Sequence, residues 1–197
     1  SACSSAASSA SSQPAKAACN SRFLRRPSAF SSLRRCCCRC ANEARARQLV
    51  TGSVVLEKRA YGDIWLRDTG PLVLCHENGE RCAQRFGFNG WGGKYLMEGD
   101  QTIGAELAGD ADLPLTVADW ILEGGAIDGD GTGLVVTTEQ CLLNPNRNPD
   151  LDRGKIETLL AGSLGLSDML WLGDGLLNDH TDGHVDNLAR FVATDTV

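Results

Sequence analysis

The chain has 197 residues, of which 42% are hydrophobic and 22% are charged, and its formal net charge at pH 7 is −6. This length suits a single domain, and the hydrophobic fraction is enough to bury a core. The charge is uneven, because residues 1–60 have eleven Lys or Arg and two acids, whereas residues 61–197 have eight Lys or Arg and 23 acids. The acidic second part argues against a nucleic-acid partner and favours a cationic ligand. The apolar runs are strand-sized, so we expect no membrane-spanning helix.

The first segment, residues 1–49, is rich in Ser, Ala and Arg and contains one acid, Glu43. Such a composition cannot bury enough apolar surface to offset the entropy of ordering, so we expect a disordered leader. It is typical of an organellar transit peptide, and a stretch that does not belong to the natural protein is the alternative. We therefore expect the protein in the cytoplasm, or in a plastid or mitochondrion if the leader is a genuine transit peptide.

The chain has nine Cys, and only Cys75, Cys82 and Cys141 lie outside the leader. An odd, scattered set does not indicate a disulfide framework, so we expect these three to be reduced. In the leader, Cys37 and Cys40 have the spacing of a zinc-ligand pair, but no second pair follows them, so we do not expect zinc there.

The second segment, residues 50–197, predicts alternating strands and helices in chain order. Strands are expected at 53–58, 71–76, 168–172 and 187–193, with a strand, a turn and another strand within 120–138. Helices are expected at 101–109 and 152–165, and Gly165 suits a left-handed helix end. The alternation of strands and helices favours an α/β fold.

Four polar clusters interrupt these elements, namely YGDIWLRDTGP at 61–71, FGFNGWGGKY at 86–95, LEGGAIDGDGTG at 122–133 and NDHTDGHVDN at 178–187. The first could be a strand end with a surface Arg–Asp pair, and the second an aromatic loop over the core. The third could be a simple hairpin turn; its likeness to a calcium loop is weak, because the ligand spacing is wrong.

The fourth cluster contains His180 and His184, which could be two metal ligands on a helix. Gly183 lies between them, and the Glu of a helical zinc motif is absent, so we expect no metal. If the segment enters a strand, His184 and Asp186 face one side and Val185 the other. A His beside an Asp suits proton transfer and cation binding.

A Cys–His pair of Cys141 with His184 would suit nucleophilic catalysis. However, Cys141 follows an expected strand and precedes a turn, where a single Cys is usually a small buried apolar residue. We therefore expect that Cys141 is not the nucleophile.

Five motifs taken together, in this order and spacing, resemble the agmatine deiminase family, which is related to the bacterial-type peptidyl-arginine deiminases. They are WLRDTGP, FNGWGGKY, EGG, TTEQCLLNPNRNP and TDGHVDNLARFV, and they extend over about residues 50–197. The resemblance implies a five-bladed α/β propeller of the pentein type, of which this chain would hold roughly the first half. Asp68, Glu123 and His184 are separated by 55 and 61 residues, as successive blades would place them.

The resemblance also implies the roles of the site residues. Asp68 and Asp186 would bind the substrate guanidinium, His184 would be the general acid and base, and Glu123 would orient His184. Trp65 and Trp91 would complete the substrate site. We expect Glu123 to raise the pKa of His184 and keep this side chain cationic.

The implied reaction is hydrolysis of agmatine to N-carbamoylputrescine and ammonia, a step in polyamine biosynthesis, through a covalent Cys thiouronium intermediate and without a cofactor. In the family the nucleophilic Cys lies near the end of the domain, and no Cys follows Cys141 here. Smaller departures from the family pattern are Gly90, where Ala is common, and His180, where Glu is common. We interpret His180 as incidental to the reaction. A peptidyl-arginine deiminase and an inactive guanidinium-binding remnant are the alternatives, and a homo-oligomer is left open.

Overall fold

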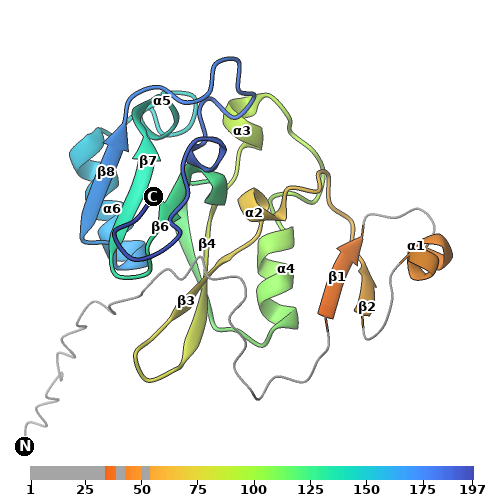
Figure 1. The fold of residues 1–197 in the computed structure, drawn as a ribbon. Helices are drawn as coiled ribbons and strands as arrows, with labels where there is room; N and C mark the ends of the chain where they lie inside the picture. Colours follow the sequence, from red (N-terminus) through yellow and green to blue (C-terminus); the bar gives the residue numbers. More distant parts are fainter. Residues whose placement is uncertain (1–33, 39–42, 50–53) are drawn as a thin grey trace, which may run out of the picture.

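The computed structural model describes residues 34–38, 43–49 and 54–197. The strands are β1 (Arg34–Cys38), β2 (Val54–Lys58), β3 (Leu72–Cys75), β4 (Arg81–Gly87), β5 (Leu115–Ile121), β6 (Ile127–Gly129), β7 (Leu134–Thr138) and β8 (Asp168–Leu172). The α-helices are α1 (Glu43–Leu49), α2 (Leu66–Thr69), α3 (Gly90–Gly93), α4 (Ile103–Asp110), α5 (Glu139–Leu142) and α6 (Arg153–Leu164), and the 3-10 turns are η1 (Gly124–Ala126) and η2 (Val185–Asn187). The fold is mixed α/β (Figure 1).

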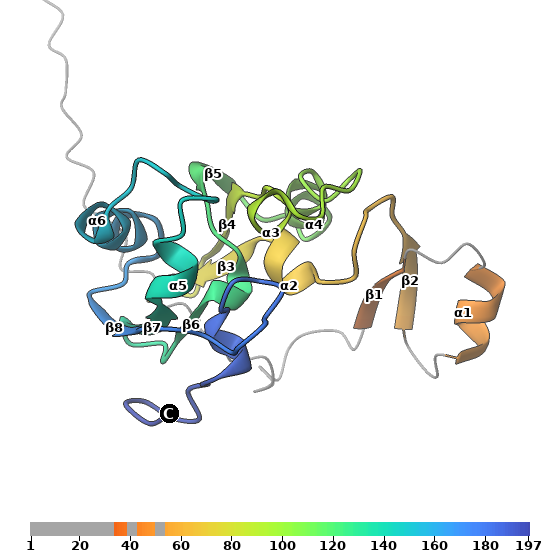
Figure 2. The ribbon, with the colours of Figure 1, turned by 90° about the horizontal axis from the view of Figure 1, so that it is seen from above.

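Two three-stranded sheets follow the same plan. In the first, β3 and β4 form an antiparallel hairpin, and β5 returns parallel to β4 after α3 and α4. In the second, β6 and β7 form the hairpin, and β8 returns parallel to β7 after α5 and α6. The parallel pair β1–β2 lies beyond α2, at the end of the molecule away from both sheets (Figure 2).

The turns that join these units come together. The turn α2 lies between β2 and β3, η1 lies between β5 and β6, and η2 follows β8. In the folded chain α2 contacts η1, and η1 contacts η2. Residues that are separated in the sequence by one three-stranded sheet therefore meet where α2, η1 and η2 come together.

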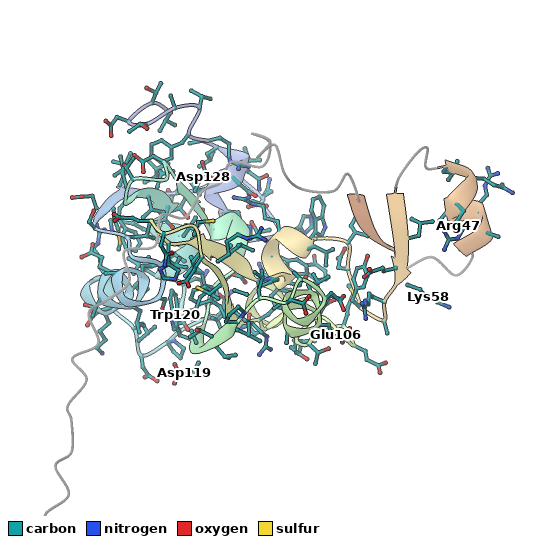
Figure 3. The ribbon with its side chains drawn as sticks, turned by 90° about the horizontal axis from the view of Figure 1, so that it is seen from below. Arg47, Lys58, Glu106, Asp119, Trp120 and Asp128 are labelled. Carbon is teal, nitrogen blue, oxygen red and sulfur yellow. The ribbon has the colours of Figure 1, made fainter. Side chains whose placement is uncertain are left out.

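One hydrophobic core joins the two three-stranded sheets and α6. Ile156, Leu160 and Leu164 of α6 are fully buried, because their spacing places them on one face of the helix. Trp120 of β5 packs edge-to-face on Phe86 of β4, with ring centroids 5.1 Å apart. In Figure 3, Trp120 lies within the body, whereas Lys58 lies with the β1–β2 pair.

Most of the expected elements of the second segment are confirmed. The expected strands correspond to β2, β3, β6, β7 and β8, and the expected helices to α4 and α6. Gly165 ends α6 with a φ of 70°, in the left-handed region. The expectation did not include β4, and it contained only the end of β5, from Trp120. Among the described residues, no helix is long and apolar enough to cross a membrane.

The expected strand at 187–193 is wrong. Residues 185–187 form η2, and no named strand follows. The backbone N–H of Phe191 donates instead to Asp128 Oδ2 at 2.8 Å, and Arg190 Nε donates to Asp128 Oδ1 at 3.0 Å. The buried Asp128 thus pairs a backbone N–H that a neighbouring strand would otherwise pair, and Figure 3 shows Asp128 beside the C-terminal segment.

Two elements lie inside the segment that we expected to be a disordered leader. Residues 34–38 form β1, and residues 43–49 form α1. The rest of the leader, including Cys40, lies outside the described residues. Cys75, Cys82 and Cys141 are free cysteines, as expected.

Leu160→Ala tests the core that holds the two sheets together. Because Leu160 is fully buried, we expect the free energy of unfolding to fall by about 2–5 kcal/mol. Thr158→Ala, on the exposed face of the same helix, should change it by less than about 0.5 kcal/mol. Urea unfolding followed by circular dichroism measures both, and equal losses in the two variants would contradict the assigned packing.

Candidate active site

A cavity of about 460 Å³ opens where the three turns meet. It is lined by Asp63, Trp65, Asp68, Trp91, Tyr95, Asp179, His180, Thr181, His184, Asp186 and Asn187. The lining contains four carboxylates and no Lys or Arg. Such a cavity attracts a cation, and its aromatic side chains add apolar contact surface.

Asp68 is the carboxylate at the end of α2, and its side chain is 8% exposed. Its Oδ1 accepts a hydrogen bond from the Gly125 backbone N–H at 2.8 Å, and its Oδ2 accepts one from Trp91 Nε1 at 3.1 Å. Burial raises the pKa of Asp68 to about 6, although these two hydrogen bonds oppose the shift. The carboxylate is therefore held in place by neutral donors, and no Arg or Lys is bonded to it among the described residues.

Trp91 reaches Asp68 through an unusual backbone conformation. Its φ is 55°, within a run in which Gly90, Gly92 and Gly93 also have positive φ. A Trp in this region is strained by about 1–3 kcal/mol, and such strain persists only where the surroundings enforce it. The Asn89 side chain accepts a hydrogen bond from the Gly92 backbone N–H, which fixes the loop and aims the indole N–H at the carboxylate.

The second carboxylate, Asp186, belongs to η2 and forms an ion pair with Arg67, with Nε 3.1 Å from Oδ2. Burial raises the pKa of Asp186, and the Arg67 and Arg190 charges oppose that shift. A Cβ at Gly125 would lie 2.4 Å from His184 Nδ1, 2.8 Å from Asp68 Oδ1 and 3.0 Å from Asp186 Oδ2. Asp68, Asp186 and His184 therefore converge on a point that only glycine leaves free.

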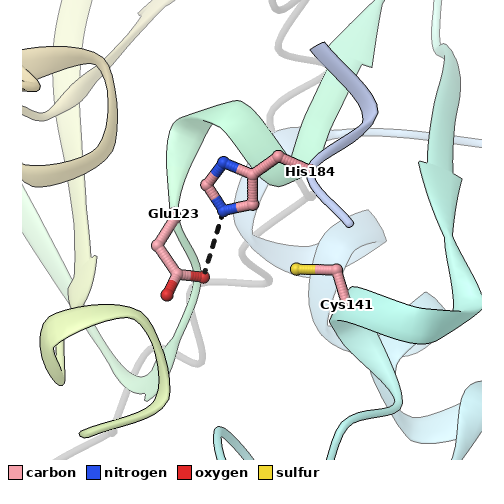
Figure 4. A group of neighbouring side chains, drawn as sticks. All are labelled: Glu123, Cys141 and His184. Carbon is pink, nitrogen blue, oxygen red and sulfur yellow. Dashed lines mark ion pairs between the residues drawn. The ribbon is translucent and has the colours of Figure 1, made fainter. Parts of the chain in front are cut away.

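His184 lies between two carboxylates and is almost fully buried. Its Nδ1 is 3.8 Å from Asp68 Oδ1, and its Nε2 is 4.0 Å from Glu123 Oε2 (Figure 4). No hydrogen-bond partner for Nε2 is found in the described part of the chain.

The expectation that Glu123 keeps His184 cationic is wrong for this chain. Burial, and next the positive charge of Arg147, lower the pKa of His184 to about 4. Both oxygens of Glu123 are occupied by Arg147 Nε at 3.1 Å, so the Glu123 charge is largely compensated before it reaches the imidazole. The sequence reasoning placed Glu123 beside His184 correctly but did not include the arginine behind it.

Cys141 lies close to His184 and Glu123, with the potential ligand atoms of all three within 4.8 Å of one another (Figure 4). It is fully buried, it is not part of the cavity lining, and burial raises the pKa of its thiol. These properties do not suit a nucleophile. The donor set does not suit a metal either, because Arg147 already takes both Glu123 oxygens and would place a cation beside the metal.

The loop that precedes His184 is organised by Asp179. Its side chain accepts hydrogen bonds from Thr181 Oγ1 and from the backbone N–H groups of Gly183 and His184, both at 3.1 Å. His180 lines the mouth of the cavity, where its Nδ1 is hydrogen bonded to Tyr95 Oη at 2.9 Å. We interpreted His180 as incidental to the reaction; the structure places it in the cavity lining, beside Tyr95.

Comparison with known proteins identifies the chain's family. A model of the family described as Porphyromonas-type peptidyl-arginine deiminase matches residues 6–197. The chain belongs to this family.

The similar proteins of the deiminase family include several agmatine deiminases. The agmatine deiminase of Pseudomonas fluorescens is 42% identical over 158 residues, which are 76% of this chain and 42% of that protein. The structure of C. jejuni agmatine deiminase with substrate bound is 39% identical, with a TM-score of 0.68 over 73% of this chain and 43% of that chain. The agmatine deiminase structure of Enterococcus faecalis is 33% identical, with a TM-score of 0.73 over 76% of this chain and 43% of that chain. This chain thus spans less than half the length of these deiminases.

The structure brings together the six residues that the deiminase motifs singled out. Trp65, Asp68, Trp91, His184 and Asp186 line the cavity, and Glu123 lies behind His184. His184 and Asp186 both face Gly125, as a shared side predicts. However, Asp186 lies in the 3-10 turn η2 and His184 directly precedes it, so the two residues do not belong to a strand.

The sequence reasoning missed Arg147, Gly125 and the Tyr95–His180 pair at the rim. For Arg147 the available signal was a cation inside the polar turn NPNRNP, which follows the apolar pair Leu142 and Leu143.

Gly125→Ala tests whether the side chains of Asp68, His184 and Asp186 converge next to Gly125. The new Cβ would overlap His184 Nδ1 and crowd both carboxylates, so we expect a loss of about 1–3 kcal/mol in the free energy of unfolding and altered His184 ring signals in NMR spectra. Gly162→Ala in α6 is the matched control: no atom lies within 4 Å of its Cβ position, so alanine should stabilise the protein by roughly 0.5–1 kcal/mol. A Gly125→Ala protein with wild-type stability and unchanged His184 signals would show that the site is looser than described.

Proposed function

We propose that this chain supplies the guanidinium-binding and proton-transfer part of an agmatine deiminase, a hydrolase that converts agmatine to N-carbamoylputrescine and ammonia. The observation that supports this most directly is the pair Asp68 and Asp186 beside His184 in a cavity lined by no Lys or Arg. The similarity to agmatine deiminases at about 40% identity supports the same activity.

Asp68 and Asp186 would bind the guanidinium of the substrate. The guanidinium stays protonated at any working pH, so burying it without partners would be unfavourable. Each carboxylate can accept N–H groups from it, which fixes its plane and compensates its charge. The raised pKa values of Asp68 and Asp186 support this assignment, because a bound cation would offset the burial that raises them. Trp91 would hold Asp68 in place, and the half-exposed Trp65 would cover the substrate.

His184 would move the proton that the reaction requires. With a pKa of about 4 it is neutral at pH 7, so it begins as a base that takes the proton from the attacking thiol. The thiolate sulfur bonds to the guanidinium carbon, and the C–N bond then breaks as His184 returns the proton, so that ammonia leaves. Water, deprotonated by His184, then attacks the thiouronium carbon. The C–S bond breaks, and the departing thiolate takes the proton of the new hydroxyl group, which leaves the carbonyl of N-carbamoylputrescine. His184 passes the proton that it took from water to the released ammonia and is neutral again.

The nucleophilic thiol would belong to the part of the family domain that this chain does not span. Cys141 is fully buried and does not line the cavity, and the sequence has no later Cys. By itself the chain would then bind a guanidinium without turning it over, which is the inactive-remnant alternative. The two repeated units and their converging turns support a five-bladed propeller for the whole domain.

A peptidyl-arginine deiminase is the second candidate, because the matching family model carries that description. Both activities need the same guanidinium site and differ in what lies around the rest of the substrate. Ammonia release from agmatine and from an arginine-containing peptide, measured on a protein with the whole family domain, separates them. Turnover of agmatine alone supports our proposal, and turnover of the peptide alone would overturn it.

Binding of agmatine should weaken as the pH falls through 6. Asp68, with its pKa raised to about 6, is ionised above that pH and loses its charge below it, while agmatine stays cationic throughout. We expect the dissociation constant, measured by titration calorimetry, to rise about tenfold between pH 7.5 and pH 5. Asp68→Asn should bind more weakly at pH 7.5 and lose this dependence. The same pH dependence in the variant would assign it to another group.

A further inference from the structure

We propose that Arg147 is a positioning residue for the proton-transfer step, which fixes the Glu123 carboxylate behind His184 and fastens it to the loop that carries His184. This inference rests on the proposed function, because it concerns how His184 is held for that chemistry. Arg147 cannot contact the substrate directly, since its side chain is 1% exposed and it is not part of the cavity lining.

The contacts of Arg147 use the whole guanidinium. Its Nε donates to Glu123 Oε1 and Oε2, both at 3.1 Å. Its Nη1 donates to Asp182 Oδ2 at 2.7 Å and to Asn146 Oδ1 at 2.9 Å, and its Nη2 donates to the Thr181 backbone carbonyl at 2.7 Å. A planar guanidinium can make these bonds in three directions at once, and a lysine ammonium cannot reproduce their geometry.

These bonds join two segments that are distant in sequence. Glu123 follows β5, whereas Thr181 and Asp182 belong to the loop before His184. Lys94, from the glycine-rich loop that carries Trp91, reaches the same Asp182 and also donates to the His180 backbone carbonyl at 2.9 Å. The hydrogen bonds from Lys94, Asn146 and Arg147 outweigh burial and lower the pKa of Asp182 to about 2, which keeps this bridge charged.

The turn that carries Arg147 is itself anchored on both sides. The Asn148 side chain accepts from the Ile121 backbone N–H and donates to the Ile121 carbonyl, each at 2.9 Å. Asn89 Nδ2 donates to the Asn146 carbonyl at 2.8 Å. The guanidinium therefore starts from a fixed backbone, and its position is transmitted to Glu123 and to the loop of His184.

The position of Glu123 matters for His184 because few hydrogen bonds orient this imidazole. Its Nε2 has no hydrogen-bond partner in the described part of the chain, and Glu123 is 4.0 Å away. The charged groups that act on it are Asp68, Glu123, Asp179, Asp182, Arg67 and Arg147. Among these, Arg147 both opposes protonation of His184 and sets where the Glu123 carboxylate lies.

The first experiment is an NMR titration of the His184 ring in this chain, with His76→Gln and His180→Gln used to assign the signals. Arg147→Met removes a positive charge and leaves Glu123 uncompensated, and both changes favour protonation. We expect the proton affinity of His184 to rise about tenfold or more. Arg147→Lys keeps the charge and should leave the affinity close to that of the unaltered chain. Arg153→Met, which removes an exposed cation that pairs with Glu139, is the control and should have no effect.

Arg147→Met leaves the buried Glu123 carboxylate without its cation, so among these variants it is expected to lose the most stability. The double variant Arg147→Met/Glu123→Gln avoids that charge. It should fold and give His184 a higher proton affinity than Glu123→Gln alone, since the two proteins differ only in the cation. No difference between these two proteins would overturn the inference, whether or not the single variant folds.

The second experiment measures agmatine turnover by a protein with the whole family domain. Arg147→Lys should lower kcat about 10- to 100-fold through misplacement of the proton-transfer pair, while KM stays within about twofold, because the cavity lining is intact. An unchanged kcat would overturn the positioning role. If the unaltered enzyme does not turn over agmatine, the proposed function fails, and the NMR titration still decides whether Arg147 controls His184.

Discussion

Charge compensation of carboxylates that surround one buried imidazole is the constraint on which this site depends. Arg147 compensates the charge of Glu123, and Arg67 compensates the charge of Asp186. Asp68 receives only neutral N–H donors, from Gly125 and Trp91. Within the described part of the chain, Asp68 thus has no positive charge beside it on the side that faces the cavity. A cationic guanidinium would supply that charge, and the proposed substrate therefore follows from what the protein leaves uncompensated.

The repeated units of the fold create this constraint. Each three-stranded unit ends in a parallel strand, and the turn that follows carries a polar residue to the place where the turns meet. Asp68 precedes one hairpin, Glu123 precedes the next, and His184 follows the last strand. Close approach of three turns requires a glycine at position 125, where any larger residue would overlap the imidazole. The strained backbone at Trp91 is held in place by the hydrogen bond from the Gly92 backbone N–H to Asn89 and by that from the indole N–H to Asp68.

The sequence predicts much of the fold and which residues form the site, but not the long-range contacts among the charged side chains. Periodicity was sufficient for α6, and the motif order was sufficient to bring Asp68, Glu123 and His184 together. The strand expected at 187–193 did not form, because the backbone N–H of Phe191 donates to Asp128, 63 residues earlier, and no local sequence pattern reveals such a partner. The protonation of His184 was predicted wrongly for the same reason. It depends first on burial of the imidazole and next on the charge of Arg147, and both arise only in the tertiary structure.

The most direct test of guanidinium recognition is a crystal structure of this chain with agmatine bound. We expect the planar guanidinium group to lie in the cavity between the Asp68 and Asp186 carboxylates, next to Gly125 and His184, with the alkyl chain leading past Trp65 toward the rim at His180 and Tyr95. Agmatine bound in the reverse direction, with its amine at Asp68, or bound outside this cavity, would contradict the assignment of the two carboxylates and with it the proposed function.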